Sequence, residues 1–204
     1  MSAAQSVTSR DQDPSSVRLA PHSKDPFVAP TDRDMLPSER RQFVRTHRTC
    51  IFGYGRRLDG PAMSVVYYVQ AENDDLLVAT MAERAKAKAV ARHDKVSLCV
   101  LDETWPFAYL QVYCDAVIDE DHDTLIDVMM AVAERMSGDP LGPELRPVVE
   151  AVAEQERRVL VRCRPYSTFV TPPRHLHSND QVEPLTHWVS AAMPWDASDM
   201  PGEP

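Results

Sequence analysis

The residues with the clearest chemical potential in this sequence are a cluster of cations between positions 80 and 88. The segment Thr80-Met81-Ala82-Glu83-Arg84-Ala85-Lys86-Ala87-Lys88 follows a strand-like run and carries Arg84, Lys86 and Lys88 within five positions. Arg and Lys donate charge-assisted hydrogen bonds to phosphate oxygens, and free backbone N–H groups at a helix start attract anions. The cluster is therefore a candidate phosphate site, with the hydroxyl of Thr80 beside it. A solvated basic helix face is the alternative, and composition alone favours it.

Other patterns that could carry chemistry are weaker. His175-Leu176-His177 has metal-like spacing, but no carboxylate or thiol constellation accompanies it, so a mobile tail is the better interpretation. The acidic run at 119–123 opens a helix, where negative charge is expected. The four cysteines form no Cys-x-x-Cys pair and lie in apolar runs, which predicts buried, reduced thiols. We predict no metal site, and the sequence carries no signature of a Ser or Cys hydrolase.

The elements around the cationic cluster predict a mainly β fold of the α+β type. Strand-like runs occur at 49–55, 62–70, 76–80, 95–101, 107–118 and 159–170, the first three as an antiparallel meander. A helix should begin near Leu36-Pro37-Ser38-Glu39, and a second should lie within 83–93. A helical insert should occupy about 121–156, before the last strand. Because no β-α-β alternation repeats and no Gly-rich phosphate loop occurs, a small closed barrel is favoured over a doubly wound sheet.

Two polar extensions flank this domain. Residues 1–34 show no periodicity and are predicted to be a flexible N-terminal extension, whereas residues 35–170 form the barrel domain. The C-terminal extension, 171–204, is also rich in proline but contains Trp188 and Trp195. Because exposed indole surface favours burial, we expect part of this extension to dock on the domain or on a partner copy.

Composition restricts the partners and the location. The chain has 204 residues and a formal net charge of -9, so it gains no counterion-release energy on a nucleic-acid backbone. No apolar run approaches the ~20 residues that cross a bilayer. The N-terminus lacks the apolar core of a signal peptide. These features predict a cytoplasmic protein that binds neither nucleic acid nor membranes.

From about Leu36 to Val170 the chain resembles the flavin-binding split β-barrels related to pyridoxamine-phosphate oxidase, and within them the branch that uses the deazaflavin F420. The order and spacing of several pieces carry the resemblance. They are the helix start at 36–39, the hairpin at 59–68, Arg84-Ala85-Lys86 leading into 93–100, the strand at 107–112 and the closing run at 157–161. The resemblance implies a six-stranded antiparallel split β-barrel. It also implies a homodimer with two cofactor sites at the subunit interface and a phosphate held by Arg84 and Lys86.

The resemblance also suggests roles for single residues. Ser64 and Val66 alternate with Val65 and Tyr67, so by position the first pair is assigned to the cofactor side of its strand. Thr80 and Ser64 would hydrogen-bond the cofactor, and Lys88 would assist the phosphate site. Trp105 would wall the ring pocket or pack in the dimer interface. The chain departs from the family pattern at Ala89, where many relatives have Asn, and at the glycines of 53–55.

The function implied is an oxidoreductase that moves a hydride between F420 and a small unsaturated or conjugated substrate, with FMN as the alternative cofactor. Because the cofactor performs this chemistry, no catalytic side chain is named. Arg56, Arg57 and Arg92 are candidates to bind the polyglutamate tail of F420. A non-catalytic flavin-, F420- or haem-binding protein stays open, with His47, His93 and His122 as candidate haem ligands, as does a scaffold that has lost its ligand.

Overall fold

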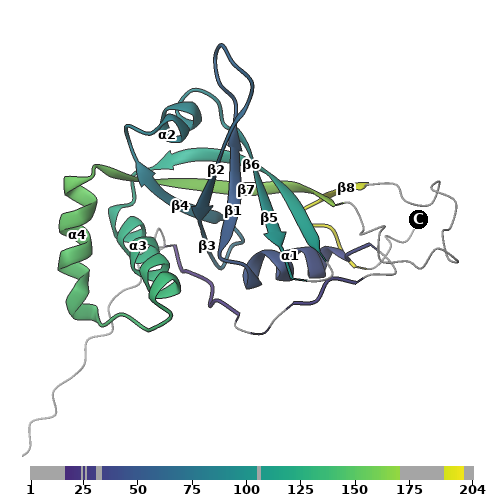
Figure 1. The fold of residues 1–204 in the computed structure, drawn as a ribbon, viewed down its shortest axis with the longest axis horizontal. Coiled ribbons are helices and arrows are strands. Elements are labelled where there is room, and N and C mark those ends of the chain that lie inside the picture. Colours follow the sequence, from purple (N-terminus) through teal and green to yellow (C-terminus); the bar gives the residue numbers. More distant parts are fainter. Residues whose placement is uncertain are drawn as a thin grey trace, which may run out of the picture.

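The computed structural model describes residues 17–23, 25, 27–30, 34–104, 107–170 and 191–199 (Figure 1). Its helices are α1 (Pro37–Thr46), α2 (Ala85–Val90), α3 (His122–Ser137) and α4 (Arg146–Gln155), with a short 3-10 turn at Pro143–Leu145. Its strands are β1 (Thr49–Tyr54), β2 (Ala62–Tyr67), β3 (Val69–Gln70), β4 (Leu76–Met81), β5 (Lys95–Asp102), β6 (Ala108–Asp119), β7 (Arg158–Val170) and β8 (Ala191–Pro194). The mainly β, α+β class predicted from the sequence is confirmed.

The strands form one antiparallel sheet that curls into a half-barrel. Their order is β2-β1-β5-β6-β7-β4-β3, and β8 pairs with the outer end of β7. The curl brings β2, at one edge of the sheet, into contact with β4 near the other edge, although no ladder joins the two strands. This opening between two strand edges is the split of the barrel.

Helix α1 closes one end of the barrel and completes its core. Pro37 occupies the first turn, where a missing N–H costs nothing, and the Glu39 carboxylate accepts a hydrogen bond of 2.8 Å from the Leu36 N–H. Phe43 and Val44 are completely buried and pack with inward residues of the strands. Burial of such side chains contributes about 1.5–3 kcal/mol each and fixes the helix against the sheet.

The strand count differs from the six predicted, because the sheet has eight strands in the described residues. The second predicted strand breaks at Tyr68, whose N–H bonds the carbonyl oxygen of Arg48 and whose hydroxyl donates to that of Val44. The chain then crosses to the other edge of the sheet as β3. Consequently β4 pairs with β3 and β7 rather than with β2, so the predicted meander is confirmed for its first two strands and wrong for its third. The eighth strand, β8, comes from the C-terminal extension.

Parts of both extensions lie against the barrel. Arg18 and Ala20 exchange backbone hydrogen bonds with Glu72 and Gln70, so this stretch of the extension predicted to be flexible continues the sheet edge beside β3. Trp195 is buried in the core, and its indole N–H donates to Asp74 at 3.3 Å. Docking of a C-terminal tryptophan on the domain is therefore observed within one chain. Residues 171–190, including Trp188, His175 and His177, lie outside the described residues.

The helical insert was predicted at about 121–156, and α3 and α4 occupy these positions. The two helices lie side by side at one end of the sheet (Figure 1). Arg146 at the start of α4 joins them by ion pairs with Asp123 and Asp127 of α3. Among the described residues, no helix is long and apolar enough to cross a membrane.

Candidate functional site

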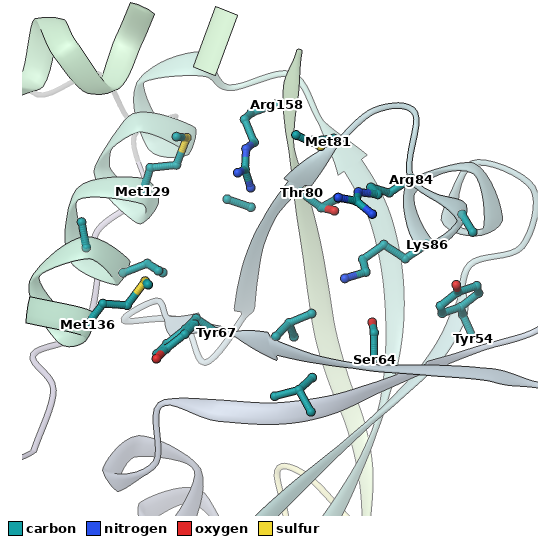
Figure 2. Close-up of a pocket in the computed structure, with 16 residues that line it drawn as sticks. Tyr54, Ser64, Tyr67, Thr80, Met81, Arg84, Lys86, Met129, Met136 and Arg158 are labelled. Atoms are coloured by element: carbon teal, nitrogen blue, oxygen red, sulfur yellow. The ribbon is translucent and has the colours of Figure 1, made fainter. Parts of the chain in front are cut away.

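An open pocket of about 640 Å³ lies in the split between β2 and β4, with α2 on one side and α3 on the other (Figure 2). Its volume is within the range of about 300–1,000 Å³ that is usual for ligand sites. The residues that line it are Tyr54, Ser64, Val65, Val66, Tyr67, Ala79, Thr80, Met81, Arg84, Ala85, Lys86, Met129, Val132, Ala133, Met136 and Arg158. Five of the seven residues predicted for the cofactor site are therefore brought together here: Ser64, Val66, Thr80, Arg84 and Lys86.

The α2 side of the pocket is strongly cationic. Burial lowers the pKa of Lys86, and the charges of Arg84 and Arg158 lower it further. Arg158 is paired with Glu156 at 2.5 Å, whereas no ion pair is formed by Arg84 or Lys86 within the described residues. Unpaired cations that repel one another on one side of a pocket favour an anionic ligand, and a phosphate would accept charge-assisted hydrogen bonds from both Arg84 and Lys86.

The helix itself contributes little to this attraction. α2 contains only six residues, shorter than the 83–93 segment predicted, so the side-chain cations carry the site. Lys88 does not line the pocket, because its Nζ lies 2.7 Å from a carboxylate oxygen of Glu83 on the exposed side of the turn. The predicted assisting role of Lys88 is therefore not supported by the geometry. Trp105 lies outside the described residues.

The floor of the pocket contains an unsatisfied polar atom. The side-chain oxygen of Ser64 is buried and has no hydrogen-bond partner in the structure. Figure 2 shows Ser64 and Lys86 directed toward the same part of the pocket. Most buried polar groups in proteins are hydrogen-bonded, so an orphaned hydroxyl in a pocket indicates the position of a polar ligand atom.

Strand edges provide further polar groups. Within the part of the chain that the structure describes, β2 is the terminal strand of the sheet and pairs only with β1, while the β4 residues that line the pocket pair only with β7. Edge strands present unpaired backbone N–H and C=O groups. The pocket also extends around the edge of β2, which is why Val65 and Tyr67 line it together with Ser64 and Val66. The sequence predicted that Ser64 and Val66 face the cofactor and that Val65 and Tyr67 face the opposite side. Because all four residues line the pocket, this separation is incomplete.

The α3 side of the pocket is apolar, and the sequence analysis did not identify it as part of the site. Met129, Val132, Ala133 and Met136 stand at i, i+3, i+4 and i+7, which places them on one helix face. That periodicity is also the pattern of an ordinary core-facing helix, so spacing alone could not separate the two. Arg158 was missed as well, because only its pairing opposite Met81 across the β4–β7 ladder brings it to the pocket.

A second, basic pocket of about 470 Å³ also borders α2. Its basic lining residues are Arg56, Arg57, Arg92, His93 and Lys95, so the three arginines predicted as additional anion ligands do come together. Arg56 is paired with Asp59 at 2.6 Å, and Lys95 is paired with Asp115. The two pockets follow α2: Lys86 lines the first and Ala89 the second, about 4.5 Å of helix rise apart.

The histidines predicted as candidate haem ligands are placed elsewhere. The ring of His47 donates from Nδ1 to the Phe43 carbonyl oxygen at 2.6 Å and packs against the Phe43 ring. His93 lines the basic pocket, and His122 begins α3. Within the described part of the chain, no histidine lines the main pocket, and no group of three or more His, Cys, Asp or Glu side chains could hold a metal ion.

Comparison with known proteins agrees with this architecture. The sequence model of the pyridoxamine 5'-phosphate oxidase family matches residues 36–165. A conserved hypothetical protein from Mycobacterium tuberculosis superposes with a TM-score of 0.61 at 24% identity, covering 78% of this chain and 99% of that chain. A heme binding protein from Mycobacterium smegmatis superposes with a TM-score of 0.52 at 11% identity, covering 80% of this chain and 59% of that chain.

A FAD-binding protein from Mesorhizobium loti has a TM-score of 0.50 at 11% identity, covering 66% of this chain and 90% of that chain. None of the curated proteins matches this chain. At these identities the solved structures show a shared fold, while the sequence match shows descent. The match over residues 36–165, on a half-barrel whose split holds a cation-lined pocket, shows that the chain belongs to the pyridoxamine 5'-phosphate oxidase family.

Proposed function

We propose that this protein is an oxidoreductase that binds the deazaflavin F420 between β2 and β4 and passes a hydride to a small unsaturated or conjugated substrate. The observation that carries the proposal is the pair Arg84 and Lys86, which have no carboxylate partner among the described residues and face a pocket whose floor holds the orphaned hydroxyl of Ser64. A cofactor with a phosphate and a polar ring system satisfies both features.

The side chains have separable tasks in this proposal. Arg84 and Lys86 bind the phosphate, and Ser64 hydrogen-bonds the ring system beside the unpaired edge of β2. Thr80 is buried at the end of β4 and offers a second hydroxyl next to the cations. Hydride transfer is the chemistry that the deazaflavin supplies when bound, so the chain binds, orients and keeps water away.

The basic pocket supports F420 over FMN. Both cofactors carry one phosphate on a sugar-alcohol chain, but only F420 continues into several carboxylates. A ligand that leaves the phosphate at Lys86 and follows α2 reaches Arg57 and Arg92, neither of which forms an ion pair within the described residues. The chain has a net charge of -9, so five basic residues around one pocket are not a general property of its surface.

We also propose that the protein acts as a homodimer. The outward face of the sheet carries a row of uncharged residues that are opposed across neighbouring strands: Val65, Ile51, Cys99, Gln111 and Phe169. Val65 is 73% exposed in the single chain and also lines the pocket. A second copy on this face would bury Val65 and close the adjacent side of the pocket, which supports a site completed by two protomers.

Equilibrium titration of F420 and FMN, measured side by side by fluorescence, tests the proposal. Replacing both cations (Arg84→Ala with Lys86→Ala) should weaken both cofactors at least 100-fold, since charge-assisted hydrogen bonds contribute about 1.5–3 kcal/mol each. Lys88→Ala is the matched control, because Lys88 belongs to the same helix but pairs with Glu83. Unchanged affinity in the double variant, or binding of neither cofactor by the wild type, would overturn the proposal.

A second pair of variants separates the two cofactors. Arg57→Ala with Arg92→Ala should weaken F420 about tenfold or more and leave FMN unchanged, because FMN has no charge that reaches the basic pocket. If FMN binds more tightly than F420 and this pair affects neither, the protein is an FMN enzyme of the same fold.

A further inference from the structure

The main pocket has two chemically different sides, and the proposed phosphate-bearing cofactor accounts only for the cationic side. The α2 side presents Arg84 and Lys86, whereas the lining residues that α3 itself contributes are uncharged: Met129, Val132, Ala133 and Met136. The charged group that Figure 2 shows beside Met129 is Arg158, which is paired with Glu156 at 2.5 Å. The charged residues of the same stretch of α3 are used elsewhere. Arg135 donates to the Tyr68 carbonyl oxygen, and Glu134 accepts a hydrogen bond of 3.0 Å from the Leu141 N–H.

The α3 wall is a fixed element with adaptable side chains. The helix has an Asp121 side chain as its N-cap and Gly138 in the left-handed conformation at its C-terminal end. Along the same face, nearer the helix start, Leu125 and Val128 pack with strand residues such as Leu77, and Met129 and Val132 pack against this cluster. Methionine side chains rearrange easily and their sulfur atoms make favourable contacts with aromatic rings. Such a wall keeps its backbone position, while its side chains adapt to apolar molecules of different shape.

Apolar surface remains exposed at the mouth of the pocket. Met136 is 63% exposed, and Val65 across the opening is exposed as well. Single apolar side chains at a surface are common, but their convergence on one pocket indicates a binding site. Covering this surface releases water at about 25 cal/mol for each Å² of apolar area, whereas a charge placed against it would lose hydration without gaining a partner.

We propose that the α3 face is a second subsite, which takes a neutral, apolar, ring-bearing molecule beside the phosphate-bearing ligand. The binding of this molecule does not depend on the proposed function. Its role as the hydride acceptor does rest on the proposed function. An anionic molecule would instead be drawn to Arg84 and Lys86 and would compete with the cofactor phosphate. The subsite therefore selects for absence of charge, and the substrate is an uncharged unsaturated or aromatic compound.

A pair of naphthalene probes that differ in charge tests this subsite without turnover. The neutral probe 6-propionyl-2-(dimethylamino)naphthalene should bind with blue-shifted emission. Met136→Glu should weaken it at least tenfold, because a carboxylate enters the apolar wall, whereas Met136→Leu should leave its affinity within about twofold. The anionic probe 1-anilinonaphthalene-8-sulfonate should instead lose affinity in Lys86→Ala. Met130→Glu is the control, because Met130 is on the same helix but does not line the pocket.

The outcomes separate this inference from the proposed function. If F420 binds and the neutral probe does not, or if Met136→Glu leaves the probe unaffected, the apolar subsite is wrong and the cofactor site stands. If the neutral probe binds as described but F420 and FMN do not, the subsite stands and the oxidoreductase proposal fails. Displacement of the neutral probe by inorganic phosphate would place the probe at the cations and would overturn the inference.

Discussion

At the scale of single residues, Lys86 shows how a binding site opposes the stability of its own fold. Burial and two neighbouring guanidinium groups lower its pKa, so the charged form is disfavoured in the folded protein. Without an anion, Lys86→Met should therefore raise the melting temperature by about 1–3 °C, consistent with a small free-energy gain in a chain of this size. The same variant should lose the melting-temperature increase that F420 gives the wild type.

The pH dependence of this effect has a defined sign. Below its lowered pKa, Lys86 is charged in both the folded and the unfolded chain, and the free-energy cost of burying its charge is fully present. As the pH rises through that pKa toward the ordinary value of 10.5, the unfolded chain binds more protons, so the folded protein gains relative stability. The gap in melting temperature between Lys86→Met and the wild type should therefore narrow as the pH rises toward 10.5. A constant gap, or a less stable variant, would contradict this account.

The sequence predicted the residues whose role depends on local order and missed those whose role depends on pairing across the sheet. Arg84 and Lys86 directly follow a strand, so their place beside a strand end was predictable. Lys88 looked equivalent by spacing, but its partner Glu83 neutralises it locally. Arg158 is 72 positions beyond Lys86 (158 − 86) and reaches the pocket only through the β4–β7 register, which no local pattern encodes.

At the scale of elements, α3 links a helix cap to ligand binding. Burial raises the pKa of Asp121, but hydrogen bonds from the hydroxyl and the backbone N–H of Thr124 outweigh it, and the pKa lies below its ordinary value. Asp121→Ala should lower the free energy of unfolding by about 1 kcal/mol, as the loss of an N-cap does, while Asp121→Ser should retain most of it. Urea denaturation monitored by circular dichroism measures both.

The two variants should also differ in ligand binding and in their response to acid. Because α3 forms the apolar wall, loosening its first turn should weaken the neutral naphthalene probe more than F420. The stabilisation by Asp121 is present above its ordinary pKa and is lost as the pH falls through the lowered one. The stability difference between the wild type and Asp121→Ala should therefore shrink below pH 4. A difference that grows in acid would rule out this role.

Most elements could be predicted from periodicity, and the exceptions have a tertiary cause. The run from 62 to 70 has uninterrupted strand propensity, yet it divides at Tyr68 because that side chain is buried under α1. β8 is short and follows a proline-rich stretch, so only its pairing with β7 makes it a strand. Burial and cross-strand pairing override local preference at these positions.

At the scale of the whole molecule, the proposed dimer explains why a row of uncharged residues crosses the outward face of the sheet. Gly53 lies in this face, and a Cβ there would approach the Ser97 hydroxyl oxygen to 3.0 Å, so the surface is closely packed even without a partner. A stable interface buries about 1,200–2,000 Å² in total, which a face that spans five strands can supply. The exposed edge of β2 would lie at its border, next to the pocket.

Cys99 gives the sharpest test of this assembly, because it stands in the middle strands of the face, opposite Ile51 and Gln111, and is only partly buried. Cys99→Arg places one charge from each protomer in the interface, where an unpaired charge is costly, so it should shift the protein to monomers in analytical ultracentrifugation. Val148→Asp on the exposed face of α4 is the control and should stay dimeric.

Because Val65 belongs to both the face and the pocket, the monomeric Cys99→Arg variant should also bind F420 at least tenfold more weakly. A monomeric wild type, or a monomeric variant with full cofactor affinity, would show that one chain suffices to build the site.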